Sequence, residues 1–214
     1  MTDKRVTVRK TGIVFIAAGT ALLLLALGLL CRSRAEDIRA GQQAEYLLSV
    51  IRAASAAKQQ DGSGQILPKA DEDGEADALP ELPTAIIDGY GYIGQLALPT
   101  LQLTLPVMSD WDYDRLKIAP CRQFGWPCTD DLVIAAHNYP SHFGRLDRLA
   151  KGDSVIFTDM DGQETGYSVR EICIIPPTQA ASVFDSGFDL VLYTCTYGGE
   201  NRVAVFCDRV GDTN

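Results

Sequence analysis

The stretch LVLYTCTYGGENRVAVFC, residues 190–207, consists of two apolar, β-branched runs that flank a segment containing two glycines. Apolar runs of this length on either side of a glycine-containing turn are typical of a β-hairpin. The thiol of Cys195 ends the first run, and the guanidinium of Arg202 begins the second. The stretch therefore predicts a hairpin that brings a nucleophile and a permanent cation to the two sides of one turn.

The register of this hairpin follows from the position of its turn. A turn centred between residues 199 and 200 places Tyr197 opposite Arg202 and Cys195 opposite Ala204. Cys195 and Arg202 then share a face, with backbones about 7–8 Å apart on a diagonal. A slip of one residue would send Arg202 to the other face. The same register puts Cys207 opposite Leu192, so that Cys195 and Cys207 should not face each other.

Short strands dominate the chain from residue 86 onward. Apolar runs interrupted by proline fill 92–108, a compact run fills 131–138, and 154–175 reads as two strands joined around Asp161-Gly162. The segment 140–153 reads as a loop with one short helix. About seven or eight strands with little helix predict a mostly-β closed barrel or a sandwich.

The N-terminal part of the chain is different in character. Residues 1–11 form a basic tail, and 12–31 is an uncharged apolar run of about 20 residues, the length of a transmembrane helix. Residues 32–60 have helical spacing and predict a helical stalk, whereas 61–85 are acidic and proline-bearing and predict a flexible linker. The predicted order is therefore tail, membrane anchor, stalk, linker and a catalytic domain at 86–214.

Charge and composition exclude some partners and cofactors. The net charge of −9 argues against binding to nucleic acid. The acidic linker lacks the ligand spacing of a calcium loop, and no cysteine pair with zinc-finger spacing stands beside the histidines. We therefore expect neither a metal nor another cofactor.

The residues that could carry chemistry are few. A neutral thiol is a weak nucleophile, and an imidazole can remove its proton. Of the two histidines, His137 ends an apolar strand, where its ring can be fixed. His142 lies in a loop, where we expect a surface or substrate-edge residue. Arg202 could meet the oxyanion that forms when Cys195 attacks a carbonyl.

Six cysteines also allow a structural interpretation. Cys121 and Cys128 could form a disulfide if the domain lies outside the cytoplasm. Cys173 and Cys207 lie in apolar strands and are expected in the core.

Together, these motifs resemble the sortase family. Tyr193-Thr194-Cys195 followed by Arg202 resembles the sortase signature TLxTC…R. The segment LVIAAHNYPSHFGRLDRLAKGD, residues 132–153, resembles the segment that carries the sortase histidine, and 91–108 resembles the two opening strands of the sortase barrel. The resemblance covers about residues 90–210. Ala136 stands where the family usually has glycine. Asn138 and the HFG that follows resemble class B, but the long helix that class B usually inserts is missing. The subclass is therefore open.

The resemblance implies a closed eight-stranded β-barrel with one or two short helices, anchored by a single N-terminal membrane helix with the N-terminus in the cytoplasm. It implies a Gram-positive cysteine transpeptidase that cleaves an LPXTG-like C-terminal sorting motif of secreted proteins. The thioacyl intermediate is then resolved by an amine of a peptidoglycan precursor or a pilin. Cys195 would be the nucleophile, His137 the acid/base and Arg202 the oxyanion and substrate stabiliser, while Thr194 would touch substrate. The alternatives are a cysteine protease or hydrolase on the same scaffold and a catalytically silent membrane-anchored binding module.

Overall fold

The computed structural model describes residues 3–60 and 83–211 of the chain. Residues 3–60 form one continuous helix, α1 (Asp3–Gln60). Within it, Phe15–Ala53 is long and apolar enough to cross a membrane, with a mean hydropathy of 2.1. This helix is a candidate membrane anchor. Most of the predicted linker at 61–85 lies outside the described residues, and the predicted domain boundaries stay predictions.

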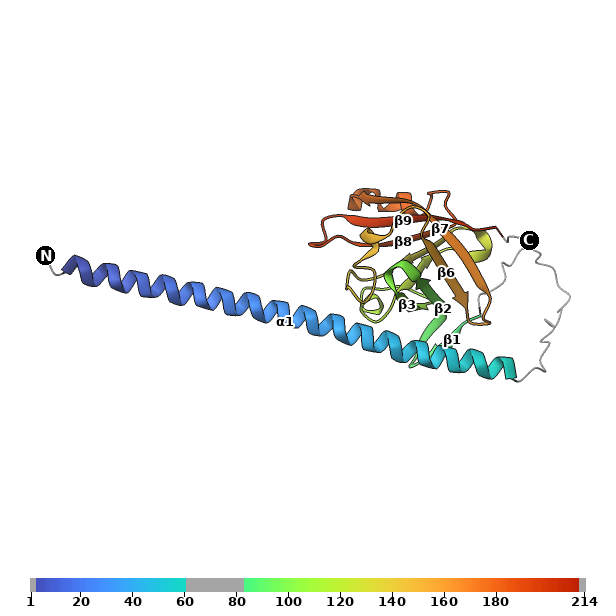
Figure 1. The fold of residues 1–214 in the computed structure, drawn as a ribbon, viewed down its shortest axis with the longest axis horizontal. Helices are drawn as coiled ribbons and strands as arrows, with labels where there is room; N and C mark the ends of the chain where they lie inside the picture. Colours follow the sequence, from blue (N-terminus) through green and yellow to red (C-terminus); the bar gives the residue numbers. More distant parts are fainter. Residues whose placement is uncertain (1–2, 61–82, 212–214) are drawn as a thin grey trace. The chain divides into compact units, whose positions relative to one another are not determined.

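Residues 83–211 form a closed β-barrel (Figure 1). The strands are β1 (Ala85–Ile87), β2 (Tyr90–Leu98), β3 (Leu103–Met108), β4 (Cys121–Phe124), β5 (Leu132–Ala135), β6 (Ser154–Asp159), β7 (Glu164–Ile175), β8 (Leu190–Cys195) and β9 (Arg202–Arg209). Their order is β1-β2-β3-β4-β5-β8-β9-β7-β6, and β2 also pairs with β6. That last pairing closes eight strands into the predicted barrel, and β1 is appended to it through β2.

The predicted hairpins are present, and two strands are additions. β6 with β7 and β8 with β9 are antiparallel pairs, as the sequence predicts, and β2 also pairs antiparallel with β3. β1 and β4 were not predicted. The helical content of the barrel also differs, because the single short helix expected near 140–153 is one of several 3-10 turns. These are η1 (Pro99–Leu101), η2 (Arg115–Lys117), η3 (Pro127–Thr129), η4 (Leu146–Arg148) and η5 (Pro177–Val183).

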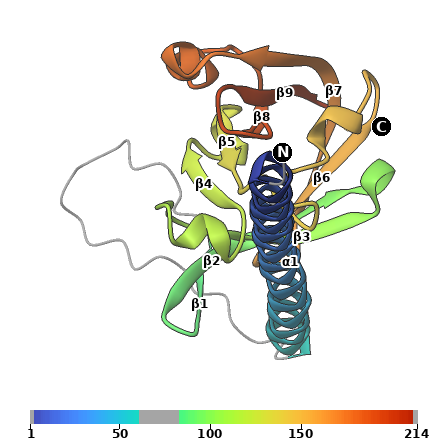
Figure 2. The same cartoon turned by 90° about the vertical axis from the view of Figure 1, so that its left-hand side faces the viewer.

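Alternation along the strands produces two apolar surfaces on the wall formed by β5, β8 and β9. Ile134, Leu192 and Val205 face the main core inside the barrel. Val133, Val191 and Phe206 face outward and pack with side chains of the β7–β8 connection, which contains η5. This wall is therefore buried on both faces, and Figure 2 shows β5 beside β4 and β8.

The C-terminal part of α1 belongs to the same compact unit as the barrel. This unit begins at Ala40. Leu47 and Ile51 are 2% and 3% exposed. They pack in a cluster with Tyr92, Met108 and Cys121. The helix thus provides apolar cover for the outside of β2, β3 and β4.

Replacing Leu47 by alanine should lower the free energy of unfolding by about 2–5 kcal/mol, since the change leaves a cavity beneath the helix. The neighbouring Tyr46, which is 55% exposed, is the matched control, and its alanine variant should stay within about 0.5 kcal/mol of wild type. Urea unfolding of the full-length protein in detergent micelles measures both. Equal losses in the two variants would show that the helix does not pack on the barrel.

Candidate active site

Cys195 and Arg202 are direct partners across the β8–β9 hairpin. The sequence-based register was therefore wrong by two residues: Tyr193, not Cys195, pairs with Ala204, and Leu190, not Leu192, pairs with Cys207. A shift of two keeps every side chain on its predicted face. The outcome is a closer pair than the predicted diagonal, because directly opposed residues in an antiparallel ladder have Cβ atoms about 4.5–5.5 Å apart.

The turn between the two strands is consistent with the register that pairs Cys195 directly with Arg202. Gly198 and Gly199 both have positive φ, at 93° and 79°, a conformation that glycine adopts without steric cost. The amide of Thr196 donates to the Asn201 carbonyl at 2.9 Å and closes the loop. The guanidinium Nη1 of Arg202 donates to the carbonyls of Gly199 and Asn201, both at 3.0 Å. The turn therefore anchors the cation that follows it.

His137 reaches the same edge from the neighbouring strand β5. β5 and β8 are parallel, and their last paired residues are Ala135 and Tyr193. The amide of Ala136 donates to the Tyr193 carbonyl at 3.2 Å and extends the ladder by one residue. Continuing the same register by one more residue places His137 beside Cys195, on strands about 4.8 Å apart. The three predicted catalytic residues therefore meet at the ends of adjacent strands.

Thr194 and Asn138 connect the two strand ends. The Thr194 hydroxyl donates to the Ala136 carbonyl at 2.8 Å, and the side chain is only 3% exposed. The Asn138 side-chain amide donates to the Thr196 carbonyl at 3.4 Å. The Thr194 side chain faces inward, away from the face of Cys195. The contact of Thr194 with substrate stays a prediction, and only the backbone of this residue could make it.

The expectation for His142 was wrong. The residue is fully buried, at 0% exposure, and is not on the surface. Its amide donates to the Tyr139 carbonyl at 2.9 Å, and Phe143, which follows it, donates to the His137 carbonyl at 3.2 Å. The chain after β5 thus folds back in a tight turn that carries His142 inside. His137 is only half-buried.

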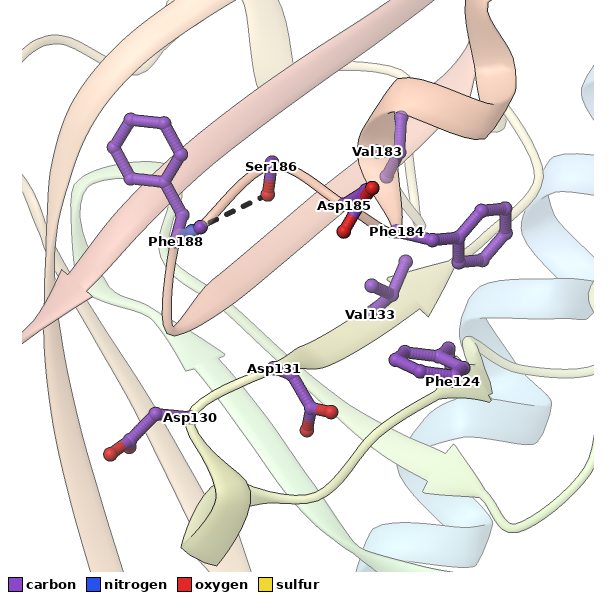
Figure 3. Close-up of a pocket in the computed structure, with 10 residues that line it drawn as sticks. Phe124, Asp130, Asp131, Val133, Val183, Phe184, Asp185, Ser186 and Phe188 are labelled. Carbon is purple, nitrogen blue, oxygen red and sulfur yellow. Dashed lines mark hydrogen bonds between the residues drawn. The ribbon is translucent and has the colours of Figure 1, made fainter.

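The outer face of β5 and β8, apolar and covered by the β7–β8 connection, extends away from the catalytic edge. It leads to a pocket of about 300 Å³ near the start of both strands, shown in Figure 3. The apolar lining consists of Phe124, Val133, Val183, Phe184 and Phe188. Phe124 and Phe184 meet edge to face, with ring centroids 5.9 Å apart.

Of the three carboxylates that line this pocket, those of Asp130 and Asp131 have partners within the chain. Asp130 forms an ion pair with Arg209 at 2.6 Å. Asp131 accepts the Trp126 amide at 3.0 Å and the Thr129 hydroxyl. The pocket therefore combines aromatic and aliphatic side chains with polar groups at its rim.

Tyr193 is a polar residue on the same face as Cys195, and the sequence analysis assigned it no role of its own. It lies between the pocket and Cys195, and its hydroxyl donates to the Gln123 side chain. Burial raises the pKa of Tyr193 to about 12, with the charge of Cys195 a further cause and the Arg202 guanidinium opposing them. The phenol therefore stays neutral at neutral pH. Strand alternation could have indicated it, since Tyr193 lies two residues before Cys195 and therefore on the same face.

The cysteines proposed as a disulfide pair are both free. Cys121 is buried, and its thiol lies 3.8 Å from the Met108 sulfur. Burial raises the pKa of Cys121 to about 12, which keeps it an inert thiol. Cys207 is a core residue as predicted, whereas Cys173 is only half-buried and its thiol donates to the Glu171 carboxylate at 2.9 Å.

The two histidines should differ in their effect on stability. Replacing His142 by alanine empties a fully buried site and should lower the free energy of unfolding by about 2 kcal/mol or more. His137→Ala removes a half-buried ring and should cost less than about 1 kcal/mol. Chemical denaturation of the two variants tests this, and a larger loss for His137→Ala would contradict the assigned positions.

Comparison with known proteins identifies the family of the barrel domain. The family model of the sortase domain matches residues 96–210, more than half of the chain. The solved structure of sortase C1 of GBS pilus island 1 is similar at 20% identity, with a TM-score of 0.51, over 57% of this chain and 66% of that one. A Clostridium perfringens sortase D5 transpeptidase is also similar at 20% identity and a TM-score of 0.51, over 59% of this chain and 83% of that one. No curated protein matches the sequence. The chain belongs to the sortase family.

Proposed function

We propose that this protein is a membrane-anchored cysteine transpeptidase in which Cys195, His137 and Arg202 carry the reaction. The observation that supports it most directly is the register of β5, β8 and β9. That register brings a thiol, an imidazole and a guanidinium together on one outward-facing surface. Sortases are cysteine transpeptidases, and these residues occupy the family's motif positions.

The first half of the reaction forms a thioester. The imidazole of His137 holds the proton of Cys195, and the thiolate attacks the carbonyl carbon of the scissile peptide bond. The carbonyl oxygen becomes an oxyanion that the Arg202 guanidinium stabilises. When the C–N bond breaks, the leaving amine takes the proton from the His137 imidazolium. The products are a thioacyl enzyme and a released C-terminal peptide.

The second half transfers the acyl group to an amine. A neutral amine attacks the thioester carbonyl, and His137 accepts the proton that the amine loses. The C–S bond then breaks, a new amide forms, and the sulfur leaves as the Cys195 thiolate beside the protonated His137. On the proposed function, the amine belongs to a peptidoglycan precursor or a pilin.

The distance between the catalytic edge and the pocket suits an extended peptide. Val133 lines the pocket and pairs with Val191. Val191 lies four positions before Cys195, which is about 13 Å along the strand. A substrate in the same extended conformation would therefore reach the pocket with a residue about four positions upstream of the scissile bond. An apolar side chain fits the rings of Phe124, Phe184 and Phe188. This matches the leucine of an LPXTG-like motif.

The apolar helix supports attachment to a membrane. On this proposal the N-terminus lies in the cytoplasm and the barrel outside the cell, where the protein acts on secreted proteins that carry a C-terminal sorting motif. The alternatives predict different products. A hydrolase would release the free acid even when an amine is present, and a silent binding module would not cleave.

Replacing Cys195 by alanine should abolish both cleavage and transfer, since no thioester can form, while the barrel stays folded. A library of peptides with LPXTG-like motifs, incubated with and without an added amine and analysed by mass spectrometry, measures both reactions. Wild-type protein should give the amide product with the amine. Only free acid would indicate the hydrolase, and turnover by a folded Cys195→Ala variant would remove this residue from the nucleophile role.

Replacing Arg202 by lysine keeps the charge but loses the planar fork of donors. The expected result is a fall in kcat of about 10²–10³ with a small change in KM, because the contact strengthens as the oxyanion develops. Arg209 is the matched control because it lies at the far end of β9, paired with Asp130. Steady-state kinetics on the best library peptide decide, and a rise in KM alone would assign Arg202 to ground-state binding.

A further inference from the structure

We propose that Tyr139 is a positioning residue whose ring fixes the imidazole of His137 for the reaction with Cys195. The two rings are stacked, with centroids 3.9 Å apart and planes only 15° from parallel. The inference rests on the acid/base role proposed for His137. In the sequence motifs, the turn after β5 has no role other than to follow the histidine. This inference gives the turn a second role, that of holding the imidazole.

His137 needs such support because it lies past the paired part of its strand. The last paired residue of β5 is Ala135. The His137 side chain is half-buried, and rotation about its two side-chain bonds would swing the imidazole between alternative positions. A flat ring packed in parallel against one face of the imidazole restricts that rotation. The ring can then present one edge to the neighbouring Cys195.

The backbone holds Tyr139 firmly enough to serve as this platform. Its carbonyl accepts the amides of His142 and Gly144, both at 2.9 Å. A side chain on Gly144 would collide with the Asn138 carbonyl oxygen and the Tyr139 backbone, so the turn depends on glycine at that position. The loop therefore packs too closely for Tyr139 to move independently of it.

The buried His142 contacts Tyr139 as well. The centroids of these two rings are 5.6 Å apart, and their planes are tilted by 60°. His142 is fully buried, so it forms part of the packed interior of the turn. We infer that His142 supports the platform and that its own contribution to catalysis is indirect. The order of contacts is then His142, Tyr139, His137 and the thiol.

The stack also suits the charge that His137 carries during the reaction. The face of an aromatic ring is electronegative and attracts a cation placed over it. In the proposed mechanism the imidazolium form must persist until it protonates the leaving amine. A phenylalanine at position 139 would retain the ring face, whereas a leucine would remove it and keep an apolar side chain.

The test uses the full-length protein in detergent micelles and three variants: Tyr139→Leu, Tyr139→Phe and, as the matched control, Tyr46→Leu. Tyr46 is 55% exposed on α1. The chain has two histidines, so protein labelled with ¹³C in the histidine rings gives two ring signals, and His137→Gln assigns them. The ring current of Tyr139 should shift the His137 ring protons upfield in wild type and in Tyr139→Phe. The shift should disappear in Tyr139→Leu and persist in Tyr46→Leu.

A second measurement reports on the thiol without any substrate. Iodoacetamide alkylation of Cys195 at neutral pH is followed by peptide mass spectrometry, because Cys31 and Cys128 are exposed as well. Tyr139→Leu should slow the alkylation of Cys195 by about two- to tenfold, the range expected for loss of one aromatic contact. Tyr139→Phe and Tyr46→Leu should react like wild type.

The outcomes separate this inference from the proposed function. Wild-type spectra without the upfield shift would overturn the positioning role, and this result does not depend on the stability of the leucine variant. A Tyr139→Leu variant whose Cys195 is alkylated at the wild-type rate would also overturn it. A Tyr139→Phe variant as slow as Tyr139→Leu would also overturn it, since the ring would not be what matters. If His137→Gln alkylates at the wild-type rate, the failure instead belongs to the proposed pairing of His137 with Cys195.

Discussion

The parallel pairing of β5 with β8 is the constraint on which the candidate active site depends. The two strands are far apart in the sequence, and each ends in one residue of the proposed catalytic pair. Their register is continued beyond the ladder by the amide of Ala136 on the Tyr193 carbonyl and by the Thr194 hydroxyl on the Ala136 carbonyl. A slip of one residue would turn one of the two side chains to the opposite face of the wall. The buried hydroxyl of Thr194 therefore matters through the register that it stabilises.

That register can be held because both faces of the wall are buried. Ile134 and Leu192 pack inside the barrel, while Val133 and Val191 pack outside it. A change of register would exchange the inner and outer sets, which are shaped to different neighbours. The outer cover comes from the β7–β8 connection, including Val183, Phe184 and Phe188. The same cover forms the walls of the pocket, so one packing arrangement both stabilises the strands and creates the pocket proposed for the sorting peptide.

The sequence was sufficient for the features that depend on local pattern. Uninterrupted apolar runs predicted β5, β8 and β9, and the resemblance of the motifs predicted the eight-stranded barrel that the family match and the structure confirm. The exact hairpin register was not accessible, because the segment between Cys195 and Arg202 allows turns one residue apart, whose registers differ by two and leave the same faces exposed. Gly198 and Gly199, both at positive φ, form the turn that is centred between them.

Other features depended on contacts that no local pattern contains. The strand β4 is only four residues long and is interrupted by a bulge where it pairs with β5, so its alternation is too short to recognise. His142 stands among turn-forming residues, which suggested exposure. Its burial follows from the way the turn folds back under Tyr139, and a single sequence does not show that fold. The Tyr193–Gln123 hydrogen bond likewise joins residues brought together only by the barrel.

The same geometry explains why a thiol and a guanidinium flank one turn. A cation near a partly buried reaction centre is useful only if it is fixed before charge develops, because a mobile side chain would have to be ordered during the reaction. Two backbone carbonyls of the turn, those of Gly199 and Asn201, hold Nη1 of Arg202. The fork carries further N–H donors, which that anchor does not use. The residue directly opposite is Cys195, so the loop that sets the hairpin register also holds the guanidinium on the strand next to the proposed nucleophile.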